Sequence, residues 1–258
     1  MISETSTLLE VPCLHRIFSE QPIGSHKIHY SIGMSIDMKE ICKKLKILNN
    51  SAIELKLPKN SVLVTFDDGW VDSKKLIGLF QKLTKLQPVL FLTTNQLSGD
   101  SSLLPLPRLY EWCNSWSLDL EVITQLGISR EWLKSLPENT QHKILDSLNI
   151  PQSSHSDEII NSEEIELFIE NGWIVGSHAH DHHDLRLETD EILRTGLKKA
   201  LDITLAKGGL PWLAWPEGRC DKRICLIAGE VGFTKQFSLN AEAGMIEFPT
   251  LIHREIWS

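Results

Sequence analysis

Short apolar runs alternate with longer helical patterns along most of this chain. Residues 61–66 and 88–93 are compact apolar runs typical of buried strands, whereas residues 35–48 and 72–86 space their apolar side chains at helical intervals. Strands that alternate with helices indicate a mostly parallel sheet. About seven such units in one domain favour a barrel over an open sheet.

The same patterns predict the remaining elements. We expect strands at residues 9–14, 173–176, 212–215, 232–237 and 250–257, and helices at residues 162–171, 189–206 and 222–230. Ser162 is the predicted N-cap of the first of these helices, and Gly172 lies just past its end. We find no repeat, low-complexity tract or linker in the sequence, so residues 1–258 are expected to form a single domain.

Residues 95–161 interrupt this alternation. The segment carries four prolines and short amphipathic runs at residues 129–135 and 140–148. We interpret it as a helical insertion, and we expect it to lie over one end of the barrel and to help define substrate access.

Two adjacent carboxylates follow the apolar run at residues 61–66. The segment reads Thr65-Phe66-Asp67-Asp68-Gly69. In a parallel barrel, side chains at the carboxyl ends of the strands line the active site. Asp and Gly are also common in surface turns, but the buried strand directly before these residues favours the active-site interpretation.

Four histidines fall within six residues just after the strand expected at residues 173–176. Neutral imidazoles are good ligands for zinc and similar metals. His178 and His182 are four residues apart, so on a helical turn or a compact loop both rings point to one centre. His180 would face away from that centre on a helix. The cluster predicts a divalent metal site, with zinc the expected ion.

A third strand, at residues 212–215, ends in the common turn Pro216-Glu217-Gly218. Together, the three segments resemble the polysaccharide deacetylase family, also called carbohydrate esterase family 4, which includes chitooligosaccharide deacetylases. Its Thr-Phe-Asp-Asp-Gly motif matches residues 65–69, and its paired-histidine motif matches residues 176–185. Residues 12–17 resemble an opening motif of many members. Residues 213–218 and 251–256 resemble motifs of one branch, and all these segments follow the family's order.

The resemblance implies a distorted (β/α)7 barrel with a helical insertion and a metal-dependent hydrolase that removes an N-acetyl group from an amino sugar. Asp67 would be the general base. Three residues would hold a divalent metal, most commonly Zn²⁺, and these are Asp68, His178 and His182. The turn that shapes the acetyl pocket would be Pro216, Glu217 and Gly218, with the backbone N–H of Glu217 helping to hold the oxyanion.

The sequence departs from the family's pattern at three places. Ala179 replaces a Ser or Thr, and Glu217 replaces the usual Tyr. The final histidine motif, which supplies the general acid, has no clear match. We expect His253, on the last predicted strand, to be the acid, with His15 as the alternative. First and last strands are neighbours in a closed barrel, so both residues lie on strands that approach the same rim.

Composition excludes several other functions. The formal net charge is −8 without a Lys/Arg-rich run, so nucleic acid is not an expected partner. The five cysteines form no Cys-x-x-Cys pair, which argues against a zinc ribbon or a disulfide framework. The sequence contains no run of about 18 apolar residues, so we expect no membrane span.

The first residues show no basic segment followed by an apolar stretch, so we expect no secretory signal and a cytoplasmic protein. A cytoplasmic substrate would be a small N-acetylated sugar, such as a nucleotide-linked or lipid-linked precursor of glycan synthesis. Two alternatives stay open: an amidohydrolase acting on a non-sugar amide, and a non-catalytic sugar-binding relative that retains the metal site. Nothing in the sequence predicts an oligomeric state.

Overall fold

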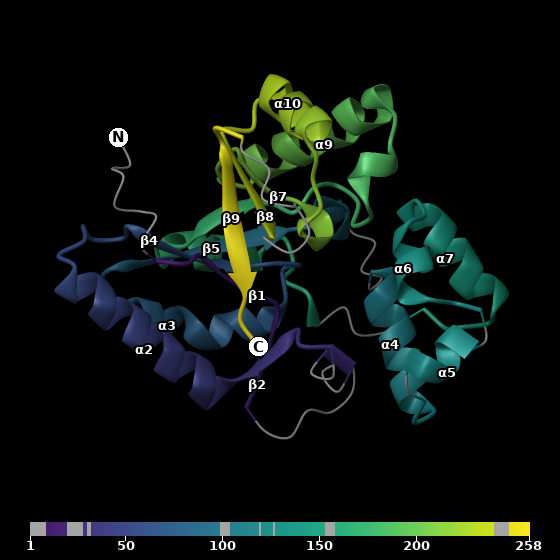
Figure 1. The fold of residues 1–258 in the computed structure, drawn as a ribbon, viewed down its shortest axis with the longest axis horizontal. Helices are drawn as coiled ribbons and strands as arrows, with labels where there is room; N and C mark the ends of the chain where they lie inside the picture. The colour runs from purple at the N-terminus through teal and green to yellow at the C-terminus, as the bar shows by residue number, and fades with distance from the viewer. Residues whose placement is uncertain are drawn as a thin grey trace.

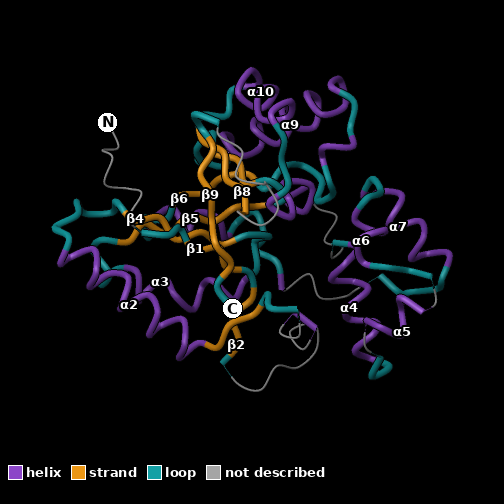
Figure 2. The backbone as a smooth tube through the Cα atoms, in the orientation of Figure 1, coloured by secondary structure: helices purple, strands orange, loops and turns teal. Residues whose placement is uncertain are grey.

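The computed structural model describes residues 9–19, 28–29, 32–98, 104–118, 120–125, 127–152, 158–239 and 248–258. Seven parallel strands among them close into a barrel, which lies at the centre of Figure 2. In spatial order these strands are β1 (Pro12–Leu14), β4 (Val62–Phe66), β5 (Leu86–Leu92), β6 (Ile174–Ser177), β7 (Trp212–Ala214), β8 (Lys235–Leu239) and β9 (Leu251–Ile256). The predicted seven-stranded barrel is therefore confirmed.

The first and last strands close the barrel. Cys13 of β1 pairs with Thr65 of β4 on one side and with Ile256 of β9 on the other, in parallel register. Because all seven strands are parallel, their carboxyl ends meet at one rim, where β/α barrels place their active sites.

Helices cover the outside of the barrel (Figure 1). They are α2 (Met38–Glu54), the 3-10 helix η2 (Val71–Leu76) with α3 (Ile77–Phe80), α8 (Glu164–Glu170), α9 (Asp190–Ala206) and α10 (Lys222–Val231). Polar side chains fix where the long helices begin: Asp37, Thr189 and Asp221 accept hydrogen bonds from backbone N–H groups of the first turns of α2, α9 and α10. One apolar face of each long helix then packs against the strands.

The predicted insertion is helical and forms a lobe beside the barrel (Figure 1). It contains α4 (Pro105–Ser115), α5 (Leu120–Gln125), α6 (Arg130–Lys134) and α7 (Glu138–Ser147). The lobe has its own apolar core, which includes Leu109, Cys113, Leu133 and Leu145. Buried Arg108 ties its parts together, because its guanidinium donates to Asp146 Oδ1 at 2.7 Å and to Pro151 O at 3.0 Å.

Three local predictions are wrong. Residues 35–37 form strand β3 (Ser35–Asp37), which pairs with β2 (Arg16–Phe18) in a small second sheet. Residues 81–86 are not helical, because α3 ends at Phe80 and β5 already begins at Leu86. Ser162 is not the cap of α8: the side chain of Asn161 accepts the N–H groups of Glu163 and Glu164. Among the described residues, no helix is long and apolar enough to cross a membrane.

Candidate active site

The chain leaves β4 through a left-handed turn that separates the two adjacent carboxylates. Asp68 has φ 66° and Gly69 has φ 73°, a backbone region that Asp tolerates better than most residues and Gly adopts freely. A Cβ at position 69 would lie 2.7 Å from Leu92 Cδ2, so a larger residue would also have to displace the end of the Leu92 side chain. As a result, Asp67 and Asp68 contact different partners.

Asp68, His178 and His182 meet at one point, as the sequence predicts. Asp68 Oδ1 lies 3.4 Å from His178 Nε2 and 3.3 Å from His182 Nε2, and the two rings are 4.9 Å apart. The histidines lie on the compact loop after β6, not on a helix, and Ala179 turns this loop with φ 65°. His180 points elsewhere, with its Nδ1 3.0 Å from Thr94 Oγ1.

The donor atoms at this point fit a divalent metal. His178 Nδ1 lies 2.9 Å from Ala214 O and therefore carries the proton, which leaves the Nε2 lone pair free. Trp70 Nε1 donates to Asp68 Oδ2 at 3.1 Å, whereas buried Oδ1 has no hydrogen-bond partner among the described residues. Two imidazoles and one carboxylate with converging lone pairs are a donor set that zinc prefers, with room for further ligands.

The close contacts among Asp68, His178 and His182 shift the pKa values of Asp68 and His182. Burial raises the pKa of Asp68, but the close imidazoles of His178 and His182 outweigh burial and hold the pKa well below its ordinary value. Burial lowers the pKa of His182, but Asp68 outweighs it and raises this pKa to about 9. The His182 cation is thus drawn to the Asp68 carboxylate, and a bound metal ion would take the place of its proton.

Asp67 is held by a buried arginine. The guanidinium of Arg254, on β9, donates to both carboxylate oxygens of Asp67 at 2.7 and 2.8 Å, and Cys13 Sγ lies 3.3 Å from Oδ2. Burial raises the pKa of Asp67, but Arg254 and then His178 outweigh it and lower the pKa to about 2. The carboxylate is therefore ionised and fixed in orientation at neutral pH.

His253 does not line the site. It is next to Arg254 on β9, and successive side chains along a strand point to opposite faces. Because Arg254 reaches Asp67 inside the barrel, His253 faces outward, where its Nδ1 lies 3.1 Å from Ser238 Oγ. The structure thus gives the predicted acid role of His253 no geometric support. The alternative, His15, lines the same cavity as Asp67.

His15 follows β1 and lies at the rim beside both carboxylates. Its side chain is buried, and its Nδ1 has no hydrogen-bond partner among the described residues. Burial is the largest influence on its pKa and lowers it, and Asp68 and Asp67 offset this only in part. A buried ring with an unused nitrogen, facing the cavity, is suited to proton transfer to or from a bound molecule.

The turn after β7 brings Glu217 to the other side of the cavity. Glu217 has φ 57°, and the N–H groups of Gly218 and Arg219 donate back to Trp215 O and Pro216 O. A Cβ at Gly218 would lie 2.5 Å from Leu239, so this turn packs too tightly for any other residue. The predicted pocket turn is therefore at the site.

The carboxylate of Glu217 forms an ion pair with Lys134 of α6, which is itself buried. Burial raises the pKa of Glu217, but Lys134 outweighs it and keeps the pKa below its ordinary value. This pair connects the insertion to the barrel and gives a physical reason why a carboxylate is tolerated at a position that the family fills with Tyr.

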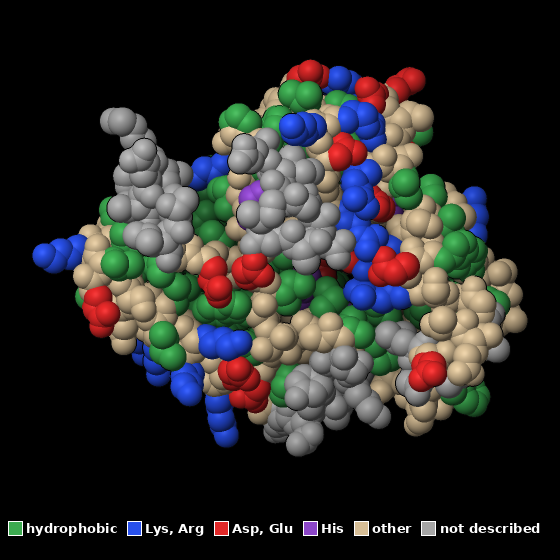
Figure 3. Space-filling model, in the orientation of Figure 1, with side chains coloured by type: hydrophobic (Ala, Val, Ile, Leu, Met, Phe, Trp, Pro, Cys, Tyr) green, Lys and Arg blue, Asp and Glu red, His purple; other side chains and the backbone are tan. Residues whose placement is uncertain are grey.

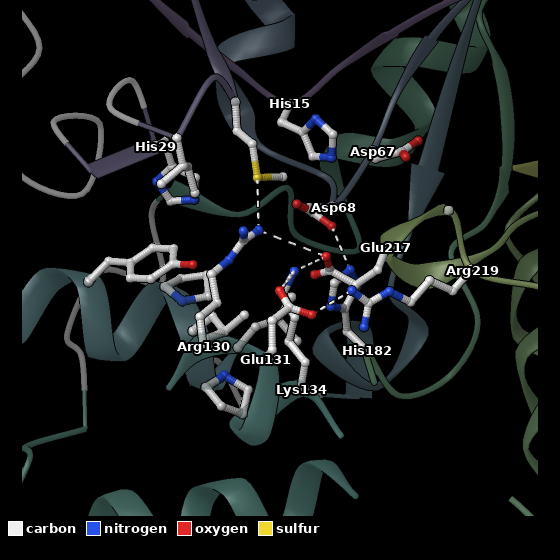
Figure 4. Close-up of a pocket in the computed structure, with 18 of the residues that line it drawn as sticks. His15, His29, Asp67, Asp68, Arg130, Glu131, Lys134, His182, Glu217 and Arg219 are labelled. Atoms are coloured by element: carbon white, nitrogen blue, oxygen red, sulfur yellow. Dashed lines mark hydrogen bonds and ion pairs between the residues drawn. The ribbon is translucent and has the colours of Figure 1, made fainter. Parts of the chain in front are cut away.

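One cavity of about 180 Å³ joins these groups. The barrel contributes His15, Asp67, Asp68, His182 and Glu217, and the insertion contributes Leu104, Pro105, Tyr110, Arg130, Glu131 and Lys134, several of which are drawn in Figure 4. The insertion therefore forms one wall of a cavity that Asp68 and His182 also line. These two residues and His178 are called the metal-binding group below.

Two site residues escaped the sequence analysis. Arg254 lies on a predicted strand, but the acid role expected for the neighbouring His253 would require His253, not Arg254, to point into the barrel. A charged residue inside a barrel is also not expected from its type alone. Lys134 is one of many lysines on amphipathic helices, and no local signal distinguishes it. Only the three-dimensional contacts with Asp67 and Glu217 reveal their roles.

Removing Arg254 should destabilise the protein strongly. Arg254→Met leaves the buried Asp67 charge unpaired, and we expect the free energy of unfolding at pH 7 to fall by about 3–5 kcal/mol. The pKa of Asp67 is lowered from 3.8 to about 2 in the folded protein. The ion pair with Arg254 therefore stabilises the wild type above roughly pH 4, and this stabilisation is lost as pH falls towards 2. Urea denaturation at both ends of this range measures it.

Arg194→Met is the matched control, because Arg194 forms an exposed pair with Glu230 at 2.6 Å. Breaking that pair should cost about 0–1 kcal/mol. Equal losses for the two variants would show that the Asp67–Arg254 pair does not contribute as argued.

Comparison with known proteins agrees with this site. The family model for polysaccharide deacetylases matches residues 54–235, a span that includes both carboxylates, the histidine loop and the turn after β7. The chain therefore belongs to the polysaccharide deacetylase family, whose members are carbohydrate deacetylases. No curated protein matches the sequence.

Solved structures with the same fold include two deacetylases and a third protein, IcaB. The deacetylase PplD of Streptococcus pyogenes, solved in complex with acetate, has 12% identity and a TM-score of 0.58, with 96% of this chain and 92% of that chain covered. A de-N-acetylase of Aggregatibacter actinomycetemcomitans has 13% identity and a TM-score of 0.59, covering 95% and 93%. IcaB of Ammonifex degensii has 16% identity and a TM-score of 0.56, covering 96% and 91%. At these identities the likeness shows the shared fold.

Proposed function

We propose that this protein is a metal-dependent hydrolase that removes the N-acetyl group of an amino sugar. The observation that carries the proposal is the convergence of three potential ligand atoms, from Asp68, His178 and His182, beside the separate, arginine-bound carboxylate of Asp67. A metal-binding group next to an ionised carboxylate is one arrangement that hydrolyses an amide with water. Membership in the polysaccharide deacetylase family supports an N-acetylated sugar as the substrate.

Asp68, His178 and His182 would hold the ion, and zinc fits their nitrogen and oxygen donors. When bound, a zinc ion supplies Lewis-acid polarisation of the acetyl carbonyl and lowers the pKa of a water molecule. The remaining steps fall to the protein's own side chains.

Asp67 is suited to accept the proton of the attacking water. Its carboxylate is ionised at neutral pH, and Arg254 fixes its orientation from the side of the barrel interior. A base that is already charged and oriented spends no free energy on rearrangement before the proton moves.

His15 is the residue that we propose as the general acid. Cleavage of the amide releases an amine, which must take up a proton as the C–N bond breaks. His15 lines the cavity beside Asp67 and has a nitrogen without a partner, whereas His253 faces away. The turn Pro216–Gly218 packs at the opposite side and would enclose the acetyl group.

A cavity of about 180 Å³ is smaller than the roughly 300–1,000 Å³ typical of pockets for larger ligands. It fits one sugar unit better than a segment of polymer. This supports a short substrate, and we propose a cytoplasmic glycan or glycolipid precursor.

The direct test is acetate release from a panel of N-acetylated monosaccharides and short oligosaccharides, with zinc added and with the metal removed by a chelator. We expect zinc-dependent release from at least one sugar. Release only from non-sugar amides would make the protein a different amidohydrolase. Sugar binding without release from any compound would make it a non-catalytic relative.

The pH dependence of acetate release tests the acid. A general acid must be protonated, so its loss of a proton produces the fall in kcat at high pH. We expect His15→Gln to reduce kcat by about 100-fold or more and to remove that fall. His253→Gln, at the outward-facing position, should keep the wild-type profile. A wild-type profile in His15→Gln would exclude His15 as the acid.

A further inference from the structure

Three cations from two parts of the chain line the cavity. They are Arg130 and Lys134 of α6 and Arg219 of the loop after β7 (Figure 4). Lys134 is neutralised by Glu217. Arg219 is neutralised by Glu131, with 2.6 Å between Nη2 and Oε2, and lies 3.8 Å from Asp184.

Arg130 has no comparable partner. The nearest carboxylate oxygen is Glu217 Oε2, at 3.9 Å, and Lys134 already holds that oxygen. Arg130 Nη2 lies 3.6 Å from Met34 Sδ, and a thioether sulfur is only a weak acceptor. Its Nε is buried without a hydrogen-bond partner among the described residues, although the side chain as a whole is 30% exposed. Arg130, Lys134 and Glu217 together therefore carry one net positive charge at the cavity.

A second polar group lies beside Arg130. Tyr110 of α4 is buried, lines the cavity and interacts with Arg130, but its hydroxyl makes no hydrogen bond of normal geometry among the described residues. Buried hydroxyl groups are nearly always hydrogen-bonded, and leaving one unpaired costs free energy. The hydroxyl and the Arg130 Nε can both donate a hydrogen bond to an oxygen atom of a ligand.

The space-filling view shows the wider surroundings of these cations. On the face drawn in Figure 3, Lys and Arg side chains gather in a band along the boundary between the α9–α10 side of the barrel and the insertion. Arg219 lies at this boundary, because it reaches from the barrel loop to Glu131 of α6. Asp and Glu side chains lie along the same band and Arg219 is paired, so the positive charge open to an anion is that of Arg130.

We infer that the substrate carries an anionic oxygen group, a phosphate ester or a carboxylate, on or next to the N-acetylated sugar, and that Arg130 and Tyr110 bind this group. A guanidinium with a free N–H and an adjacent hydroxyl match the oxygens of such an anion. The inference rests on the proposed deacetylase function. It adds a substrate class: the acetamido group lies at the metal-binding group while the anion lies at the wall formed by the insertion.

Three sugars that differ in charge test the inference on the zinc-loaded protein. N-acetylglucosamine 1-phosphate carries a phosphate ester, N-acetylmuramic acid carries a carboxylate, and methyl N-acetylglucosaminide is neutral. We expect a higher kcat/KM for an anionic sugar than for the neutral one, and the better of the two anions names the group. Arg130→Gln should reduce the ratio of anionic to neutral kcat/KM about tenfold or more, and Tyr110→Phe should reduce it by a smaller factor.

Arg194→Gln, which removes an exposed arginine on α9, is the control and should leave the ratio unchanged. A neutral sugar that reacts as well as both anions, with a ratio unaffected by Arg130→Gln, would overturn the inference and leave the deacetylase function standing. If no sugar releases acetate, calorimetry with the same three compounds decides: binding of an anionic sugar that depends on Arg130 supports the inference while the function fails. Equal or absent binding overturns it.

Discussion

Asp67→Asn should release acetate at least about 100-fold more slowly than the wild type while still binding one equivalent of zinc. Asparagine keeps the size of the side chain but cannot accept a proton at neutral pH, and general base catalysis contributes about 10²–10⁴-fold. Asp67 is not part of the converging donor set, so metal content should not change. Steady-state kinetics and elemental analysis of the same preparation measure both quantities.

The substitution also breaks the ion pair with Arg254, so a matched variant is needed. Arg254→Met breaks the same pair but keeps the carboxylate. If the lost proton acceptor is what matters, Asp67→Asn should be much the slower of the two at a temperature where both are folded. Equal rates would assign the loss to the ion pair, and loss of zinc in Asp67→Asn would make Asp67 a metal ligand.

The sequence could predict that Asp68, His178 and His182 lie together because the information is local there. Asp68 follows a buried strand directly, and His178 and His182 share one short loop after another. In a parallel barrel, the carboxyl ends of such strands meet by necessity. The expected loop geometry was left open between a helical turn and a compact loop, and the structure has the loop, turned by Ala179.

The candidate for the general acid was harder to predict, because the choice of His253 depends on which side chains of β9 point into the barrel. A shift of one residue along β9 exchanges the side chain that points inward, and the apolar residues of this strand do not alternate cleanly. The structure places Arg254 inward and His253 outward. The small sheet of β2 and β3 was missed for a related reason, because strands of three residues are too short to show a period.

The departure at Glu217 becomes intelligible only through the insertion. Lys134 is 83 residues earlier in the chain, and it lies beside Glu217 because the helical lobe docks against the barrel rim. A buried carboxylate without that lysine would lose its charge or destabilise the turn. The substituted motif residue and the insertion therefore form one structural unit, and this unit also carries the free charge of Arg130.

His178→Ala should lower zinc affinity by at least about 100-fold and abolish acetate release. Loss of an outer partner of a metal ligand already costs about 10–100-fold, and here a ligand itself is removed. His178 is also the most constrained of the three ligands, since its Nδ1 is bound to Ala214 O and its side chain is 1% exposed. Competition with a chromophoric chelator measures the affinity, and elemental analysis after gel filtration measures the zinc that remains.

His180→Ala is the matched control, because it removes an imidazole from the same loop. His180 contacts Thr94 and does not line the cavity of the metal-binding group, so this variant should retain its zinc. The comparison separates ligand loss from general loosening of the loop, which would affect both variants alike. Full zinc content in His178→Ala together with loss in His180→Ala would place the metal on the other side of the loop. The lone pairs that converge on Asp68 would then have another role, and Asp67 could no longer act on a water activated beside it.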